Sequence, residues 1–331
     1  MKRPRIGLIG YYGYGNYGDE LFHVVFRKIF HDCDLVTMQD NQTRPYYNKD
    51  LKEKIASMDC LLIGGGDLVI GSYWTDQYFE DPFLAKPIYI HGVGVPTWSR
   101  EDPKIVERLA KFFRHKSVRH INVRDHESRA WIEEKLAPSV PVTVTSDMVC
   151  ALDIPNPPKR QGPPVFGLIT RKQMPGEIHW KNVTALCDKA RSLGYEVKNI
   201  ILGTGGDRTD DLVGLAEFPY PHMRTVQSEN LVELTREIGS CDVIASMKFH
   251  GCVVSTLYGI PAITTITTDK FRNFFQAIER PELIAHHTHT NLADRLAPFM
   301  ARIPRLTRDH LRRSAIGGLA ELRRAMLDEF A

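Results

Sequence analysis

The sequence has little cysteine and no long apolar run. Its 331 residues include six cysteines, no two of them in a Cys-x-x-Cys spacing, so it gives no signal of a zinc or thioredoxin-type site. No window of about 18 apolar residues occurs, which argues against a membrane-spanning helix. The apolar run 6–9 is short and leads into glycines, and we expect neither a signal peptide nor a span there. These absences predict a cytoplasmic protein, with peripheral contact to the inner face of the membrane left open.

An excess of one charge is missing as well. Lysine and arginine number 43 and aspartate and glutamate 40, which gives a formal net charge of +3. Proteins that bind nucleic acid usually concentrate basic residues on one surface, and we therefore expect no nucleic-acid partner. His286, His287 and His289 resemble a metal-binding group, but an exposed loop explains them better, so we expect no metal.

What the sequence does contain is an alternation of short apolar runs with amphipathic stretches. Runs typical of strands buried on both faces lie at 5–10, 34–37, 60–63, 87–90 and 120–123. Helical patterns fill gaps between them, and the same alternation restarts at 165. The proline-rich stretch before it suits an interdomain linker. This order predicts a doubly wound α/β domain on each side of the linker.

The chain length is comfortable for two domains of roughly 150 residues each. The expected boundaries are an N-terminal Rossmann-like domain over 1–155, a linker over 156–164, a C-terminal Rossmann-like domain over 165–300 and a terminal helix over 301–331. Apolar residues of that helix, from Leu311 to Phe330, recur at helical spacing. Its arginines lie mostly off this stripe, which favours a solvated face, and adhesion to an anionic membrane is the alternative.

The first expected strand runs into a glycine-rich loop. Gly13, Gly15 and Gly18 form a G-x-G-x-x-G pattern between a strand and a helix, which by itself indicates a dinucleotide site. We rank that interpretation second, because Asp19 and Glu20 occupy the first turn of the helix, where they would repel a phosphate. A tight turn followed by an acidic helix start explains the spacing about equally well.

Aromatic residues gather in this loop and after the next glycine turn. The two groups are Tyr11, Tyr12, Tyr14 and Tyr17, and Tyr73, Trp74, Tyr78 and Phe79. Flat, amphipathic rings suit the faces of sugars. Packing between loops is the alternative, and we expect it for at least half of these rings.

Five motifs follow one another in an order that resembles the polysaccharide pyruvyl transferase family over about 5–275. They are Gly15-Asn-Tyr-Gly-Asp-Glu20, Leu62-Ile-Gly-Gly-Gly66, Val123-Arg-Asp-His-Glu-Ser128, Ser246-Met-Lys-Phe-His-Gly251 and Gly259-Ile-Pro-Ala262. The resemblance implies a glycosyltransferase-B-like fold, in which two Rossmann-like domains face a central cleft, the N-terminal one on the acceptor side and the C-terminal one on the donor side. It implies transfer of pyruvate from phosphoenolpyruvate to two hydroxyls of one sugar, with release of phosphate and without a metal or nicotinamide cofactor.

The same resemblance implies the site. Its basic and imidazole positions fall on Arg124, His250 and Lys270, which we expect to be catalytic, and on Lys248, where many relatives carry arginine. Arg171 could join these cations. The expected substrate-binding residues are Lys248, Arg171, Asn16, Asp19, Glu20, Gly65, Gly66 and Tyr14. One departure stands out, because Gly71 occupies the place of an aspartate that the family often carries, and Asp67 or Asp76 could substitute for it.

The chemistry fits these residue types. Phosphoenolpyruvate carries a phosphate and a carboxylate, which require cations in a concave, partly dry site, and a histidine can act as acid and base in turn. The alternatives without a catalytic role are a structural Arg124–Asp125 ion pair, surface positions for Lys248 and Lys270, and a helix cap at His250.

Two other function classes stay open. One is a glycosyltransferase that uses a nucleotide sugar, with Gly203-Thr-Gly-Gly206 as its candidate loop, and the other is a carbohydrate-binding protein without catalysis. The sequence also leaves open whether the saccharide acceptor is lipid-linked, nucleotide-linked or polymeric.

Overall fold

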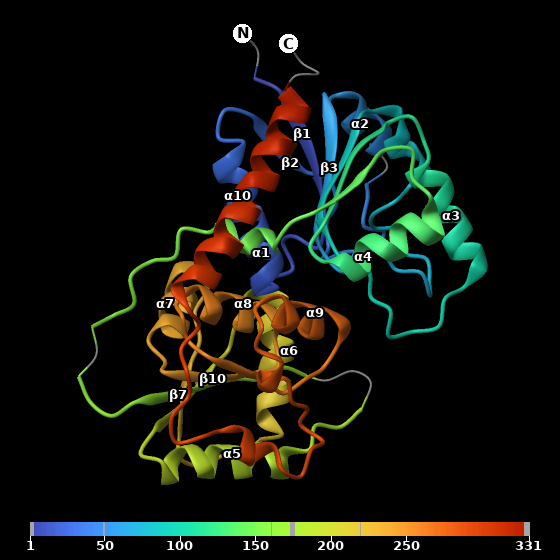
Figure 1. Cartoon of the computed structure of the whole chain (residues 1–331). Helices are drawn as coiled ribbons and strands as arrows, with labels where there is room; N and C mark the ends of the chain where they lie inside the picture. Colours follow the sequence, from blue (N-terminus) through green and yellow to red (C-terminus); the bar gives the residue numbers. More distant parts are fainter. Residues whose placement is uncertain (1–2, 49, 160, 173–175, 219, 328–331) are drawn as a thin grey trace. The chain divides into compact units, whose positions relative to one another are not determined.

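The computed structural model describes residues 3–48, 50–159, 161–172, 176–218 and 220–327, and it consists of two compact units (Figure 1). Unit 1 comprises Met1–Tyr14, Gly18–Leu152 and Leu311–Ala331, and unit 2 comprises Gly15–Tyr17 and Asp153–His310. The proline-rich stretch therefore falls in unit 2. Helix α10 (Arg305–Leu327) starts in unit 2 and continues in unit 1, and Phe330 of its expected apolar stripe lies outside the described residues.

Unit 1 is built on a parallel six-stranded sheet with the strand order β2-β1-β3-β4-β5-β6. The strands are β1 (Arg5–Ile9), β2 (Asp34–Thr37), β3 (Cys60–Gly66), β4 (Ile88–Val93), β5 (Val118–Val123) and β6 (Val142–Val144). Cys60–Ile63 are fully buried, as expected of a strand with helices on both faces.

Helices cover both faces of this sheet. They are α1 (Tyr17–Ile29), α2 (Leu51–Ala56), α3 (Pro103–Phe113), α4 (His126–Trp131) and the part of α10 from Leu311 onward. Tyr89 Oη donates to the carbonyl of Ala325 over 3.2 Å, and Arg323 reaches the carbonyl of Ile29 at the end of α1 over 2.9 Å. These bonds place α10 beside α1 on one face, and Figure 1 shows α2, α3 and α4 on the other.

Unit 2 contains a parallel five-stranded sheet with the order β11-β10-β7-β8-β9. Its strands are β7 (Val165–Ile169), β8 (Glu196–Ile200), β9 (Met223–Val226), β10 (Val243–Ser246) and β11 (Ala262–Thr264). Its helices are α5 (Trp180–Ser192), α6 (Gly205–Ala216), α7 (Leu231–Gly239), α8 (Phe249–Leu257) and α9 (Asp269–Ala277). The predicted α/β class, with a doubly wound parallel sheet in each half, is confirmed.

Each sheet has a point where the strand order reverses, between β1 and β3 in unit 1 and between β7 and β10 in unit 2. Loops at the carboxyl ends of such strands form the crevice in which ligands of doubly wound proteins bind. The glycine-rich loop follows β1, and the glycine triplet forms the end of β3. The Ser246–Gly251 motif begins at the last residue of β10, and Arg171 follows β7.

Candidate active site

Lys248 lies at the carboxyl edge of the unit 2 sheet, between β10 and α8. Its Nζ atom lies 2.5 Å from Asp207 Oδ2 and 2.6 Å from Asp211 Oδ2. Both aspartates belong to α6, one turn apart, so that their side chains share a face. Asp211 also accepts a 2.9 Å hydrogen bond from the Gly203 amide. Burial raises the pKa of Asp211 to about 6, with Lys248 opposing this rise and Asp207 adding to it.

His250 and Lys270 lie in the first turns of α8 and α9, around one shared neighbour. The ring of Phe249 lies 5.1 Å from the His250 ring, centroid to centroid, and its centroid lies 5.8 Å from Lys270 Nζ. Phe249 is buried against Phe271 and Phe274 of α9. The structure therefore brings the predicted imidazole and one predicted ammonium to the same aromatic ring, where a cation is attracted to the ring face.

Arg171 is half-buried in the loop after β7, the strand that pairs with β10. Its Nε atom donates to the carbonyl of Lys172 over 3.2 Å. Arg171 and Lys248 therefore follow the two strands that flank the reversal point of unit 2, the position that suits an anionic ligand.

The segment Gly15–Tyr17 also belongs to unit 2. The Gly15 carbonyl accepts hydrogen bonds from the amide and the hydroxyl of Thr204, and Tyr17 Oη lies 2.6 Å from Thr235 Oγ1. The predicted substrate residue Asn16 is half-buried between them. This part of the glycine-rich loop is thus held against the loop after β8.

Arg124 lies at the carboxyl edge of unit 1, directly after β5. Its guanidinium pairs with Asp67, and its Nε atom lies 3.8 Å from Asp125 Oδ2. Burial opposes the charge of Arg124, but Asp67, Asp147 and Asp125 outweigh that cost, and the pKa of Arg124 is raised. Asp125 itself caps α4 by accepting from the Ser128 amide over 2.7 Å. The carboxylate that pairs most closely with Arg124 is therefore Asp67, from the loop after β3.

Glycines let the acidic start of α1 approach the end of β3. Gly65 and Gly66 have positive φ angles of 77° and 85°, and a Cβ added at Gly66 would lie 3.1 Å from Asp19 Oδ1. Glu20 Oε1 accepts a 2.7 Å hydrogen bond from the Gly13 amide. The glutamate thus occupies a loop amide that a bound pyrophosphate would require, which disfavours the dinucleotide interpretation.

The aromatic residues divide between packing and exposure. The rings of Tyr12, Tyr17, Tyr78 and Phe79 are buried, so that half of the eight serve the core. Tyr14 is half-buried, with its ring centroid 5.5 Å from that of Tyr11. Tyr73 is 53% exposed and remains available to a ligand.

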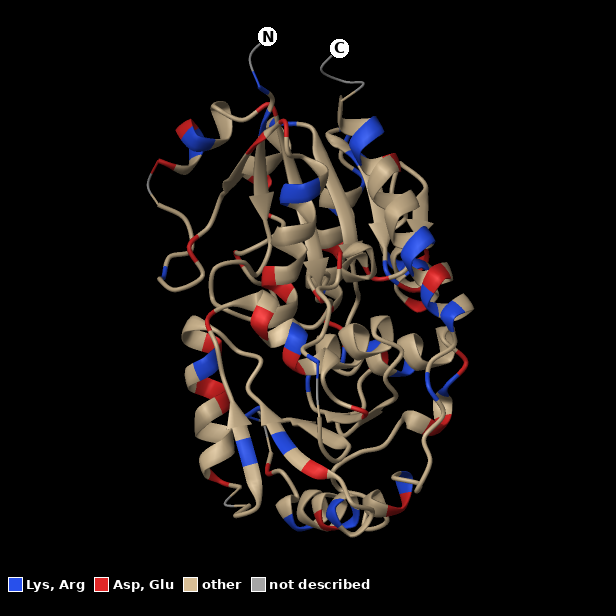
Figure 2. Cartoon of the chain, turned by 90° about the vertical axis from the view of Figure 1, so that its left-hand side faces the viewer, with Lys and Arg blue, Asp and Glu red and all other residues tan. Residues whose placement is uncertain are grey.

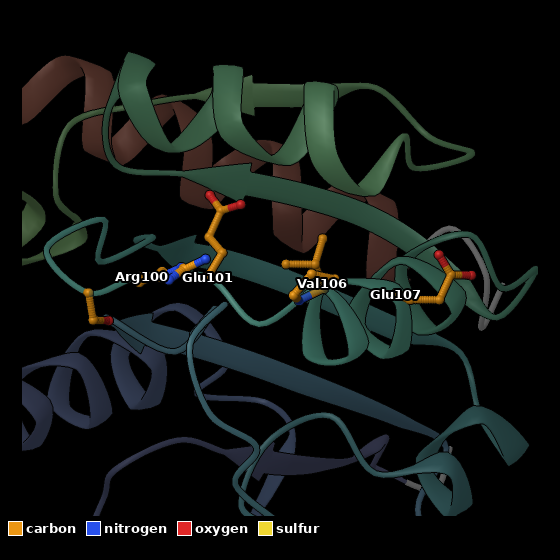
Figure 3. A pocket seen from close by; sticks show the side chains of 6 residues that line it. Arg100, Glu101, Val106 and Glu107 are labelled. Atoms are coloured by element: carbon orange, nitrogen blue, oxygen red, sulfur yellow. The ribbon is translucent and has the colours of Figure 1, made fainter.

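A pocket of about 590 Å³ lies in unit 1 beside the start of α3 (Figure 3). Its lining residues are Ser99, Arg100, Glu101, Pro103, Val106 and Glu107. Glu101 accepts a 2.7 Å hydrogen bond from Trp131 Nε1, and Ser99 donates to Ser72 over 2.7 Å. A Cβ added at Gly71 would lie 3.0 Å from the Trp131 ring and 3.6 Å from Glu101 Cγ. Trp131 and Glu101 therefore fill the space that an aspartate at position 71 would need.

Glu101, Asp207 and Asp211 are site residues that no predicted motif contains. Glu101 lies in no recognisable motif. The two aspartates did leave a signal, because their spacing of four residues follows a glycine-rich loop at the end of a strand, which puts two carboxylates on one helix face.

Charge and hydropathy add two observations on the described residues. Figure 2 shows basic and acidic segments interspersed over the helices and loops in view. In the described part of the chain, no helix combines the length and apolar character needed to cross a membrane, and no group of three or more potential metal ligands is found.

The two doubly wound units define a glycosyltransferase-B-like fold, and solved structures share it. The Staphylococcus aureus MnaA–UDP structure has a TM-score of 0.58 at 10% identity, covering 88% of this chain and 87% of that one. Sucrose-phosphate synthase from Thermosynechococcus elongatus has a TM-score of 0.56 at 10% identity, covering 99% and 98%. UDP-GlcNAc 2-epimerase from Neisseria meningitidis, bound to UDP-GlcNAc, has a TM-score of 0.54 at 11% identity, covering 99% of each chain. At such identities the likeness is one of fold.

The family follows from the sequence match. The family model for polysaccharide pyruvyl transferase matches residues 16–269, and the chain belongs to this family. It is therefore a transferase, and the resemblance seen in the motifs is confirmed. A search of curated proteins gives no significant match.

Proposed function

We propose that this enzyme transfers the pyruvyl group of phosphoenolpyruvate to two hydroxyls of one sugar, in a surface polysaccharide or its precursor. Family membership supports the pyruvyl transfer and the saccharide acceptor. The observation that carries the choice of donor lies at the carboxyl edge of unit 2, where His250 and Lys270 share Phe249 and Lys248 is the N-cap residue of the helix that carries His250. Such a site offers two ammonium groups and an imidazole to a small donor that carries a phosphate and a carboxylate.

The reaction removes one proton from each sugar hydroxyl and delivers one proton to the methylene carbon and one to the leaving phosphate. A proton is added to the methylene carbon, and the first sugar hydroxyl attacks the neighbouring carbon and loses its proton. The bond from this carbon to the phosphate oxygen then breaks, phosphate leaves, and the second hydroxyl closes the cyclic ketal as it loses its own proton. His250 is the group we assign to these proton transfers, and Lys270 and Lys248 balance the charge of the phosphate and carboxylate.

We place the acceptor sugar at the unit 1 pocket. The loops after β3 and β4 carry the exposed rings of Tyr73 and Trp98, the latter 64% exposed. Arg100 and Glu101, which line the pocket, supply hydrogen-bonding groups (Figure 3). Exposed rings with charged hydrogen-bonding groups next to a pocket of this size suit one or two sugar residues.

A nucleotide-sugar glycosyltransferase is the second candidate, since similar folds bind UDP or UDP-GlcNAc. The loop that would bind a pyrophosphate argues against it. The Gly203 amide donates to Asp211, the Thr204 amide to the Gly15 carbonyl and the Gly205 amide to Glu229. Two of these three acceptors are carboxylates, which would have to leave before a pyrophosphate could bind.

The test is phosphate release from phosphoenolpyruvate across a panel of aryl, lipid-linked and nucleotide-linked glycosides. Release that depends on one acceptor, together with a product heavier than that acceptor by the mass of pyruvic acid less one water, supports the proposal, because this is the gain expected for a pyruvate ketal. Transfer of a sugar from a UDP-sugar, with no phosphate released from phosphoenolpyruvate, would replace it with the second candidate.

A further inference from the structure

Lys248, Asp207 and Asp211 form a buried group of one ammonium and two carboxylates. The side chains of Lys248, Asp207 and Asp211 are 10%, 16% and 2% exposed. With all three ionised the group carries one net negative charge. An anionic donor would be repelled by this charge, although the ammonium that should attract the donor lies at its centre.

The two aspartates differ in how firmly they are held. Asp211 is almost fully buried and accepts from the Gly203 amide as well as from Lys248, so it connects the loop after β8 with the loop after β10. Asp207 lies in the first turn of α6, nearer to solvent, and its Oδ2 atom accepts from Lys248 Nζ. A rotation of the Asp207 side chain about its own bonds could release the ammonium, whereas Asp211 could leave only by breaking its bond to the loop.

We propose that Asp207 occupies the place of a donor anion at Lys248 and is displaced when the donor binds, and that Asp211 is a positioning residue that keeps the ammonium in place. The inference rests on the proposed function, in which Lys248 binds a phosphate or carboxylate of the donor. Asp207 thereby keeps a buried lysine paired in the empty site and makes donor binding an exchange of one carboxylate for another anion. Its presence weakens the affinity for the donor, because the donor has to compete with it.

The test uses the full-length chain and three substitutions on α6 that each remove one negative charge. Asp207→Asn and Asp211→Asn preserve the shapes of the two partners of Lys248. Asp210→Asn is the matched control, because Asp210 is exposed on the same helix and belongs to no part of the proposed site. Isothermal titration calorimetry measures the binding of phosphoenolpyruvate, and separately of inorganic phosphate, to each variant and to the wild type.

We expect Asp207→Asn to bind both anions about fivefold more tightly than the wild type and Asp211→Asn to bind them about fivefold more weakly. The affinity of Asp210→Asn for both anions should match that of the wild type within twofold. This result would show that loss of a negative charge from α6 alone does not strengthen anion binding. Restoring the carboxylate as Asp207→Glu should bring the affinity back toward that of the wild type. A melting curve for each variant reports whether it is folded.

Two results would overturn the inference. One is equal or weaker anion binding by Asp207→Asn, and the other is a gain in affinity as large in Asp210→Asn as in Asp207→Asn. The outcome is independent of turnover. If the wild type binds phosphate but releases none from phosphoenolpyruvate with any acceptor, the proposed function fails. The competition by Asp207 is still tested separately by the binding data.

Discussion

The carbonyl oxygen of Gly15 accepts two hydrogen bonds from Thr204, one from the amide over 2.8 Å and one from Oγ1 over 3.1 Å. Gly15 has a φ of 99°, and a Cβ added to it would clash with the backbone oxygen of Thr204. The glycine is therefore required both by its left-handed backbone and by a backbone that passes close to it.

Gly15→Ala should lower the free energy of unfolding by about 3 kcal/mol, because strain and clash add. Gly13→Ala is the control, since Gly13 also has a positive φ, of 82°, but nothing lies within 4 Å of its added Cβ. We expect a cost of about 1 kcal/mol for this control. Thermal unfolding followed by circular dichroism measures both. Equal losses would mean that the close approach of Thr204 does not constrain the loop.

A second prediction concerns two histidines inside unit 1. His91 Nδ1 and His120 Nε2 lie 3.3 Å apart, and the two rings are stacked. Burial lowers the pKa of His120 to about 4 and, with repulsion from His120, lowers that of His91 well below its usual range. The unfolded chain therefore takes up these protons first as the pH falls. The contribution of the two neutral histidines to the free energy of unfolding is fully present above about pH 6.5 and is lost as the pH falls toward 4.

Between about pH 6.5 and 4, each of these histidines should reduce the free energy of unfolding by about 1.4 kcal/mol for every unit by which the pH falls. His120→Gln removes one of the two titrations, so the stability difference between wild type and variant should shrink as the pH falls from 6.5 toward 4. His310→Gln, at an exposed position, serves as the control. Urea unfolding at several pH values measures the slopes. Parallel slopes for wild type and His120→Gln would show that His120 is protonated without cost in the folded state.

The fold was predictable where the local pattern of apolar residues matches the burial of the element that they form. Apolar runs such as Cys60–Ile63 indicated strands because both faces of the sheets are covered by helices. The last part of β4 was missed, because His91-Gly92 interrupts the apolar run although His91 is fully buried. The order of the strands, and with it the two reversal points, depends on contacts between distant segments and leaves no local pattern.

The candidate site was predictable from motifs only in part. The motif residues Lys248, His250 and Lys270 lie at one sheet edge, as their positions after strands indicated. Their partners did not follow from the sequence. Asp207 is 41 residues from Lys248, and Asp67 is 57 residues from Arg124, so neither ion pair has a spacing that sequence can reveal. The catalytic and binding roles themselves remain predictions.

The Arg124–Asp67 pair leads to a third prediction. Arg124→Met should lower the free energy of unfolding by about 3 kcal/mol, because it leaves Asp67, Asp125 and Asp147 without their buried cation. The double variant with Asp67→Asn should recover part of this loss. Urea unfolding of the wild type, the two single variants and the double variant gives the coupling energy between the two residues. A coupling energy near zero would mean that the interaction of Arg124 with Asp67 does not contribute to stability. Loss of activity in an Arg124 variant is informative only where the folded fraction has been measured.

The last prediction separates the proposed catalytic groups from the fold. His250→Ala and Lys270→Ala should each lower the rate of phosphate release from phosphoenolpyruvate by about 100-fold or more, because they remove the proton carrier and a cation of the donor site. Both side chains are half-buried near the ends of helices rather than in the core, so we expect each variant to lose at most about 1 kcal/mol of stability.

Matched controls come from the same unit. His222→Ala and Lys181→Ala make the same chemical changes at exposed positions and should leave the rate within twofold of the wild type. Because His250 and Lys270 share Phe249, the double variant should be little slower than the worse single variant, as is usual for groups that act on one reacting molecule. Rates that multiply in the double variant would mean that the two groups act independently. A large fall in melting temperature for either single variant would mean that its residue supports the fold, and the assignment of the donor site to this edge of unit 2 would then lose its basis.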